Sequence, residues 1–365
     1  MKKTEKKFLF DLLNTPSPSG FEADGQRKWA GYVRQYVDQV DNDHYGNTWG
    51  VLKGSGKVSE KSKTTSLMLE AHADEIGFMI SYISDDGYIR VNRIGGSDRA
   101  IVRGRVVHLL GDKGVVKGVF GNTAIHIRDS SDTKIPNWED VFIDVGAKDK
   151  DAVKAMGLRV GHPIVFAESV QEIGEKRLAG RALDNRIGGF IIAQVMSRLT
   201  ATKKKRPTCT VYAVNAVQEE IGGNGARMVT FRLSPSVAVV LDVTHATDSP
   251  GISKPKHGDV KLGGGPAITH GTANHPAVIK RLMAVADKEG INLQHEASSR
   301  FTGTDTDDVF VSKSGVPAAL VSLPMRYMHS TIEMVDLDDV EATIKLLTAF
   351  SLSVKLSDNF KAQIV

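Results

Sequence analysis

The sequence predicts an α/β protein whose main body is interrupted by an inserted β domain. Its 365 residues, 41% of them hydrophobic and 25% charged, are enough to build more than one buried core. Residues 1–76 combine helical and strand patterns, residues 77–167 show short apolar runs between turn residues, and residues 168–365 alternate helix and strand. We therefore expect residues 1–76 and 168–365 to form one body, with residues 77–167 inserted between its two parts.

The first segment starts with an amphipathic helix. Its apolar run from Phe8 to Leu13 is short, is broken by Asp11, and is followed by a Pro/Ser/Gly turn at residues 16–20. This pattern favours a helix over a signal peptide, and no stretch of the chain is long and apolar enough to span a membrane. Farther along, the apolar run at residues 66–70 predicts a strand of the main sheet.

The inserted segment is expected to be a small barrel or sandwich. Turn signals at residues 85–87, 95–97, 111–114 and 121–122 separate its short apolar runs. Strands spaced this closely are typical of small all-β domains. Within the segment, only residues 149–156 show a helical pattern.

The last segment alternates helices and strands. Helices are predicted over residues 187–199, 275–289 and from 337 onward, and strands over residues 208–217, 237–243 and 318–323. Pro276 stands at the start of the second helix and Gly290 just past its end, while Asp336 is a suitable N-cap for the last one. Because the strand at residues 237–243 is almost continuously apolar, we expect it in a buried parallel sheet, which the strands of the first segment also join.

Charge and cysteine content narrow the class of protein. Lys and Arg total 47 against 43 Asp and Glu, and the resulting net charge of +4 is spread along the chain, which argues against a dedicated nucleic-acid binder. The densest basic run, residues 203–206, is expected to be a solvated loop. The single cysteine, Cys209, excludes an internal disulfide, is expected to be buried, and fits a reducing, cytoplasmic compartment.

Acidic residues and histidines follow the apolar strands at several places, and strand ends are where α/β proteins build their sites. Taken singly, most have a plain structural interpretation: a helix N-cap for Asp184, a surface position for His72 and the glutamates, and a structural role for His329. Asp242 ends an apolar run, where an unpaired carboxylate is costly to bury and needs a partner such as a metal. Taken together, five of them supply three protein ligands to each of two metals if Asp184 bridges. These five are His72, Asp184, Glu220, Asp242 and His329.

Two further acidic residues have a place in such a site. Glu219 and Glu220 are adjacent and point in opposite directions in an extended chain, so one of them could bind metal while the other acts as a general base. Asp74 lies two residues after His72, on the same side of an extended segment. It could accept a hydrogen bond from the ring and leave the other ring nitrogen for a metal.

The segments that carry these residues resemble the M42 metallo-aminopeptidases, the family of the tetrahedral (TET) and glutamyl aminopeptidases. The likeness runs nearly end to end and is carried by residues 72–79, 181–186, 218–222, 242–244, 248–250 and 326–330, with 18–22, 262–266 and 303–305. The sequence departs from the family pattern at residues 221–226, at His245, at residues 306–308 and at Thr331. None of these positions is a proposed ligand, so the departures concern the substrate pocket.

The resemblance implies a mixed-sheet, zinc-peptidase-like catalytic domain sandwiched by helices, with residues 77–167 as a small β-barrel-like dimerisation domain. It implies dimers or dodecamers built from dimers, which act on short peptides. It also implies two divalent metal ions per subunit, with zinc expected and cobalt or manganese as alternatives.

Carried over residue by residue, the likeness assigns roles. One metal lies between His72 and Asp242, the other between Glu220 and His329, and Asp184 bridges them with a cis peptide bond after it. Glu219 is the general base on the metal-bridging water and later the general acid. Asp74 orients His72, and Asp305 contacts the substrate.

Three alternatives stay open. A glycoside hydrolase needs two carboxylates about 5–10 Å apart that flank a sugar cleft, and this chain offers adjacent glutamates and only three Trp and seven Tyr. A related di-metal amidase or deacylase would use the same ligands. A non-catalytic metal-binding scaffold would have no need of Glu219.

One sequence does not determine which residue such an enzyme prefers at the N-terminus of its substrate. It also leaves open the native metal and the oligomer size. Five basic residues could line a pocket for an acidic side chain, although a surface position is the simpler interpretation of each. They are Lys254, Lys256, His257, His295 and Arg300.

Overall fold

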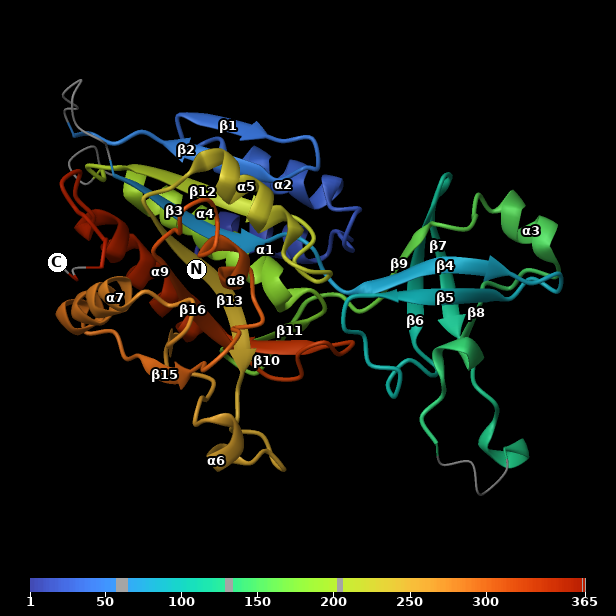
Figure 1. Cartoon of the computed structure of the whole chain (residues 1–365). Coiled ribbons are helices and arrows are strands. Elements are labelled where there is room, and N and C mark those ends of the chain that lie inside the picture. Colours follow the sequence, from blue (N-terminus) through green and yellow to red (C-terminus); the bar gives the residue numbers. More distant parts are fainter. Residues whose placement is uncertain (57–64, 129–133, 202–205, 363, 365) are drawn as a thin grey trace.

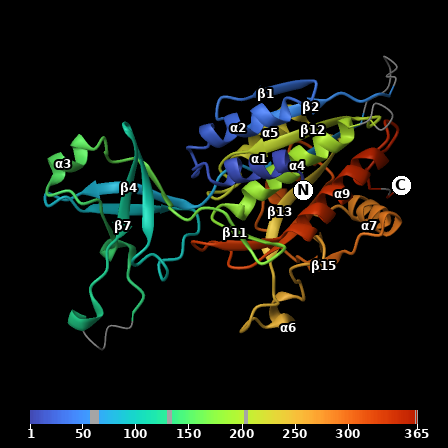
Figure 2. The same cartoon turned by 180° about the vertical axis from the view of Figure 1, so that it is seen from behind.

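The computed structural model describes residues 1–56, 65–128, 134–201, 206–362 and 364. Figures 1 and 2 show a layered α/β body from which a β-barrel projects on one side. The basic run at residues 203–206 lies outside the described residues except for Arg206, whose guanidinium pairs with Asp38. Among the helices of the described chain, none is long and apolar enough to cross a membrane.

An eight-stranded mixed sheet forms the centre of the body, in the order β1-β2-β12-β3-β13-β16-β14-β15. Its strands are β1 (Gln39–Asn42), β2 (Thr48–Leu52), β3 (Ser66–His72), β12 (Thr210–Ala216), β13 (Val237–His245), β14 (Ala267–His270), β15 (Gln294–Ala297) and β16 (Ala318–Met325). The four inner strands β12, β3, β13 and β16 run parallel. Strand β3 therefore lies between two strands of the last segment, and both ends of the chain build one sheet, as expected.

Helices cover both faces of this sheet. On one face the core includes side chains of α1 (Lys3–Leu13), α2 (Ala23–Val33), α4 (Leu183–Thr200), α7 (Pro276–Glu289) and α9 (Leu337–Ser353). On the other it includes side chains of α5 (Asn224–Leu233) and α8 (Thr306–Val309). Along β3, Leu67 and Leu69 pack into the first core and Met68 into the second, because successive strand residues point to opposite faces.

Smaller elements complete the body. β10 (Gln171–Ile173), β11 (Arg177–Gly180) and β17 (Glu333–Asp336) form a separate three-stranded sheet, and α6 (Lys254–His257) lies in the excursion between β13 and β14 (Figure 1). The expected ends of α7 and α9 are found: His275 and Asp336 cap their N-termini, and Gly290 follows α7 with a φ of 63°. That left-handed conformation is one that glycine adopts without steric cost.

The inserted segment forms a closed barrel in the order β4-β5-β8-β7-β6-β9, not an open sandwich. Its strands are β4 (Gly77–Ile83), β5 (Ile89–Ile94), β6 (Val106–Gly111), β7 (Gly114–Phe120), β8 (Phe142–Asp144) and β9 (Pro163–Phe166). Phe78 lies at the centre of its core, with ring centroids 5.0 Å from Phe120 and 5.4 Å from Phe166. Besides the expected helix α3 (Lys150–Ala155), the segment contains two short 3₁₀ turns, η1 (Ile125–Ile127) and η2 (Trp138–Asp140).

A buried charge network ties the start of the chain to the segment after β3. Glu75 accepts hydrogen bonds from the backbone N–H of Ser17 at 2.8 Å and from Arg186 at 3.3 Å, and it also pairs with Arg181. Arg186 in turn donates to the backbone carbonyl of Thr15. Buried charges persist only when they are paired and hydrogen-bonded, so this network sets the position of α4 relative to the end of β3.

Candidate metal centre

The predicted site residues meet at the carboxyl ends of the parallel strands. β3 ends at His72, β13 carries Asp242 near its end, and the turn after β12 carries Glu219 and Glu220. These side chains line a cavity of about 690 Å³, together with His329. Open α/β sheets form their ligand sites at this edge.

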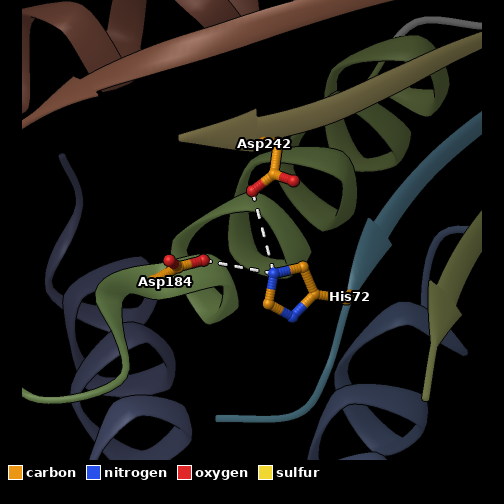
Figure 3. Close-up of side chains that lie close together, drawn as sticks. All are labelled: His72, Asp184 and Asp242. Carbon is orange, nitrogen blue, oxygen red and sulfur yellow. Dashed lines mark hydrogen bonds and ion pairs between the residues drawn. The ribbon is translucent and has the colours of Figure 1, made fainter. Parts of the chain in front are cut away.

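His72, Asp184 and Asp242 form the first of two clusters (Figure 3). The Nε2 atom of His72 lies 3.1 Å from Oδ1 of Asp184 and 3.7 Å from Oδ1 of Asp242. The three side chains come from β3, the start of α4 and β13, and all three are buried. Donor atoms from separate elements thus converge on one point, as the ligands of a small cation do.

Asp184, Glu220 and His329 form the second cluster. The Nε2 atom of His329 lies 3.4 Å from Oδ2 of Asp184 and 3.4 Å from Oε2 of Glu220. Asp184 therefore belongs to both clusters, with Oδ1 toward His72 and Oδ2 toward His329. One carboxylate shared in this way is the arrangement of a bridging ligand.

The backbone departs from helical geometry where Asp184 enters the site. Asp184 (φ −77°, ψ 111°) and Asn185 (φ −117°, ψ 37°) lie within α4 but have non-helical angles, and the peptide bond between them is cis, as the resemblance implies. The N-cap position of α4 belongs to Ala182, so the N-cap interpretation of Asp184 is wrong. Its carboxylate faces the two histidines instead.

The clusters concentrate more negative charge than a buried site accommodates without cations. Burial, together with the nearby carboxylates of Asp242 and Asp184, raises the pKa of Glu219 to about 10. Burial and Asp184 raise the pKa of Glu220 well above its ordinary value. The Oε1 atom of Glu220 is buried without a hydrogen-bond partner in the described chain. Since imidazole nitrogens and carboxylate oxygens are common donors to zinc and similar divalent ions, these residues fit two such ions.

Asp74 holds both the first histidine and the glutamate turn in place. Its carboxylate lies 3.4 Å from Nδ1 of His72 and accepts hydrogen bonds from the backbone N–H groups of Glu219 at 3.0 Å and Glu220 at 3.2 Å. Ser19 donates a further hydrogen bond at 2.6 Å. Although burial raises the pKa of Asp74, its contacts with His72 and Ser19 hold it below its ordinary value. The fully buried carboxylate is therefore kept ionised.

The two adjacent glutamates point to different clusters. Oε2 of Glu219 lies 3.9 Å from Nε2 of His72, whereas Oε2 of Glu220 lies 3.4 Å from Nε2 of His329. The turn that separates them begins at Gln218, which has a φ of 61°. Glu219 thus stands beside the first cluster without being one of its three members.

Residues 54–346 match the family model of the M42 glutamyl aminopeptidases. The chain belongs to the M42 aminopeptidase family. Members of this family are metallo-enzymes that hydrolyse peptides, and the matched segment includes every residue of the two clusters.

Individual relatives align with almost the whole of this M42 chain. It is 34% identical over 353 residues to the lysyl aminopeptidase of Pyrococcus furiosus, covering 95% of this chain and 96% of that protein. Its structure matches an aminopeptidase from the archaeon Desulfurococcus kamchatkensis with a TM-score of 0.88 and 34% identity, over 97% of this chain and 96% of that one. A TET peptidase of Pyrococcus horikoshii, which can assemble into a tetrahedron or a large octahedral shell, matches with a TM-score of 0.82 and 27% identity, over 96% and 100%.

Sequence reasoning missed Glu333, which holds two members of the second cluster by their backbone. Its Oε2 accepts a hydrogen bond from the N–H of Asp184 at 3.0 Å, and its Oε1 accepts one from the N–H of His329 at 3.2 Å. The side chain is buried at the start of β17. The sequence contained one signal for the role of Glu333, which follows His329 by four residues and starts a mostly apolar run.

A second buried acidic pair lies close to the site. Asp305 is 1% exposed, and its carboxylate lies against that of Glu70, with no other hydrogen-bond partner in the described chain. Glu70, a fully buried residue inside the apolar run of β3 that sequence reasoning treated only as part of the strand, likewise has no other partner among the described residues. Burial raises the pKa of Glu70 to about 8 and that of Asp305 well above its ordinary value. The cavity is lined by Thr304 and Asp307 on either side of Asp305, whose role as a substrate contact stays a prediction.

Glu333→Gln should weaken metal binding while the fold persists. The amide keeps one acceptor but sets an NH₂ group against the backbone N–H of Asp184 or His329, which loosens both. Loss of such a supporting partner typically costs ~10–100-fold in metal affinity. Titration against a fluorescent chelator measures the dissociation constants, with the exposed Glu341→Gln as a matched control. Equal affinities in wild type and Glu333→Gln would show that Glu333 does not support the ligands.

Proposed function

We propose that this M42 chain is a di-metal aminopeptidase that removes N-terminal residues from short peptides. The observation that carries the proposal is the pair of ligand clusters that share Asp184, with Glu219 beside them and outside both. A scaffold that only stores metal has no need of a free carboxylate at that place. Family membership supports the peptide as substrate.

The ligand set proposed for the two ions follows the clusters. His72 and Asp242 would hold one ion, Glu220 and His329 would hold the other, and Asp184, which belongs to both clusters, would contribute to each. We propose zinc, with cobalt or manganese as alternatives that suit the same donors. When bound, such ions supply Lewis-acid polarisation of the scissile carbonyl and acidify water.

The remaining chemistry belongs to side chains of the chain itself. Glu219 takes the proton of the attacking water as general base and returns it to the leaving amine as general acid, a contribution of ~10²–10⁴-fold. Asp74 fixes the backbone N–H of Glu219 and the ring of His72, so the base is held at a constant distance from the reacting groups. Burial raises the pKa of Glu219 while the clusters hold no cation, and two cations bound beside it would lower this pKa, so that the carboxylate is ionised and can accept a proton.

Other hydrolases are less well supported by this geometry. A glycosidase requires two carboxylates that flank a sugar ring, whereas Glu219 and Glu220 diverge toward His72 and His329. A di-metal amidase or deacylase would share the clusters, and a panel of peptide and non-peptide amides separates it from a peptidase.

We propose that the barrel, residues 77–167, is a dimerisation domain, and that dimers assemble further into a dodecamer. Aliphatic side chains that lie exposed on it support this: Val106, Val115, Val119, Ile125, Ile127 and Ile135 are 43–81% exposed. Val106 and Val119 are register partners on β6 and β7, and exposed apolar side chains that adjoin one another are typical of interaction surfaces. We propose, as a separate point, a cytoplasmic location. The single cysteine, Cys209, is buried and free, which suits a reducing compartment. Cell fractionation tests this location.

The purified protein should hydrolyse aminoacyl-p-nitroanilides and short peptides from their N-terminus. Dialysis against a chelator should abolish turnover, and adding back zinc, cobalt or manganese should restore it. The reason is that the reaction depends on metal ions bound between the clustered carboxylates. Release of nitroaniline measures the rate, and N-terminally acetylated substrate is the control. Turnover that survives complete metal removal, or an equal rate on the acetylated substrate, would rule out the proposed function.

Glu219→Gln should reduce kcat by about 10²–10⁴-fold, because the amide cannot accept the proton of water. The metal content should stay that of the wild type, since Glu219 belongs to neither cluster. The matched control is Glu139→Gln, which removes an exposed carboxylate of the barrel. Steady-state kinetics and elemental analysis decide the role. Near-normal kcat in Glu219→Gln would show that another group is the base.

The double variant Val115→Lys/Ile127→Lys should dissociate the assembly, because two charges replace apolar side chains that are 58% and 81% exposed in the single chain. Light scattering after size-exclusion chromatography measures the mass. Tyr45→Lys, at an exposed position of the body, is the control. A variant of unchanged mass would show that Val115 and Ile127 do not contribute to the interface.

A further inference from the structure

A second cavity adjoins the metal centre on the side of the outer strands. Its volume is about 340 Å³, and it shares Val243, Thr244, Thr302 and Thr304 with the larger cavity. Val243 directly follows Asp242 of the first cluster. The second cavity is therefore within reach of the residue whose peptide bond lies at the metals.

The walls of this cavity combine apolar groups with one acidic side chain. Leu320 is buried on β16, and Thr269 is buried on β14. Glu296 lies on β15, as the register partner of Thr269. Its Oε1 accepts a hydrogen bond of 2.6 Å from Oγ1 of Thr244 on β13, so the carboxylate reaches back across the sheet toward the metal centre.

Glu296 has no cationic partner in the described chain. None of the described residues forms an ion pair with it, and its Oε2 makes no hydrogen bond with any of them. Burial raises its pKa, which means that the ionised carboxylate is poorly stabilised by the protein. A cation brought into the cavity would supply the missing charge.

The basic residues considered for binding an acidic side chain are placed less well. Lys254, Lys256 and His257 are exposed on α6 and line neither cavity. Arg300 lines the second cavity but is exposed to solvent. An exposed side chain of this length turns outward at little cost, whereas Glu296 is held inward by Thr244.

We propose that the second cavity receives the side chain of the N-terminal substrate residue, and that Glu296 selects a basic side chain there. The apolar walls suit the methylene stem of lysine, and the carboxylate suits its ammonium group. The inference rests on the proposed aminopeptidase function and adds the class of substrate to it.

Lysyl-p-nitroanilide and norleucyl-p-nitroanilide test the proposal, because norleucine lacks only the ammonium group. The wild type should prefer the lysyl substrate in kcat/KM by about tenfold or more, and a glutamyl substrate should be the poorest. In Glu296→Gln, which keeps an acceptor for Thr244, this ratio should fall toward one, through a higher KM for the lysyl substrate. Arg300→Gln should leave the ratio above tenfold.

Other outcomes overturn the proposal. A wild type that prefers norleucyl or glutamyl substrates, or a Glu296→Gln variant whose ratio stays within about twofold of the wild type, would show that Glu296 does not select. The melting temperature shows whether Glu296→Gln keeps its fold. If it does not, Thr244→Val replaces it as the test variant, because this change releases Glu296 from its hydrogen bond and should lower the ratio of lysyl to norleucyl kcat/KM in the same way. If the wild type hydrolyses none of the three substrates, the proposed aminopeptidase function is wrong. The proposed selection of a basic side chain is then wrong as well.

Discussion

The repulsion between buried carboxylates is the constraint on which the rest of this structure depends. Asp184, Glu219, Glu220 and Asp242 converge at the end of one sheet, and burial raises the pKa of the last three. Such groups either take up protons or find compensating cations. Two divalent ions that share Asp184 as a ligand would be such compensating cations. The buried carboxylates thus lower the stability of the fold without metal, and bound metal ions remove this effect. Metal binding is therefore coupled to the stability of the fold.

The surrounding structure keeps this costly cluster in one geometry. Asp74, Glu75 and Glu333 each accept backbone or arginine hydrogen bonds from segments that are distant in sequence, and none belongs to a ligand cluster. Asp74 fixes the glutamate turn, Glu75 ties α4 to the end of β3, and Glu333 holds the backbone of Asp184. Ligands carried on five separate segments depend on such supports, because nothing local to each ligand sets its direction.

The sequence was informative where one local feature determines the structure. Apolar runs that stop at charged residues located the strand ends with His72 and Asp242, and cap residues located the ends of α7 and α9. Glu70 and Glu333 escaped notice because their significance depends on partners or neighbours far along the chain. The same limit applies to the barrel, since short strands with turns between them serve a sandwich equally well until the closing pair β4–β9 is seen.

The candidate metal ligands and the proposed selecting residue, Glu296, lie on different strands of the same sheet. Three of the five candidate ligands lie on β3, β13 and the start of α4, and the other two follow β12 and β16. The packed cores on the two faces of the sheet constrain these strands. Glu296 lies on β15, the outermost strand of its edge, and accepts a hydrogen bond from Thr244 on the inner strand β13. A substitution on β15 therefore alters the wall of the second cavity without disturbing the geometry of the ligands.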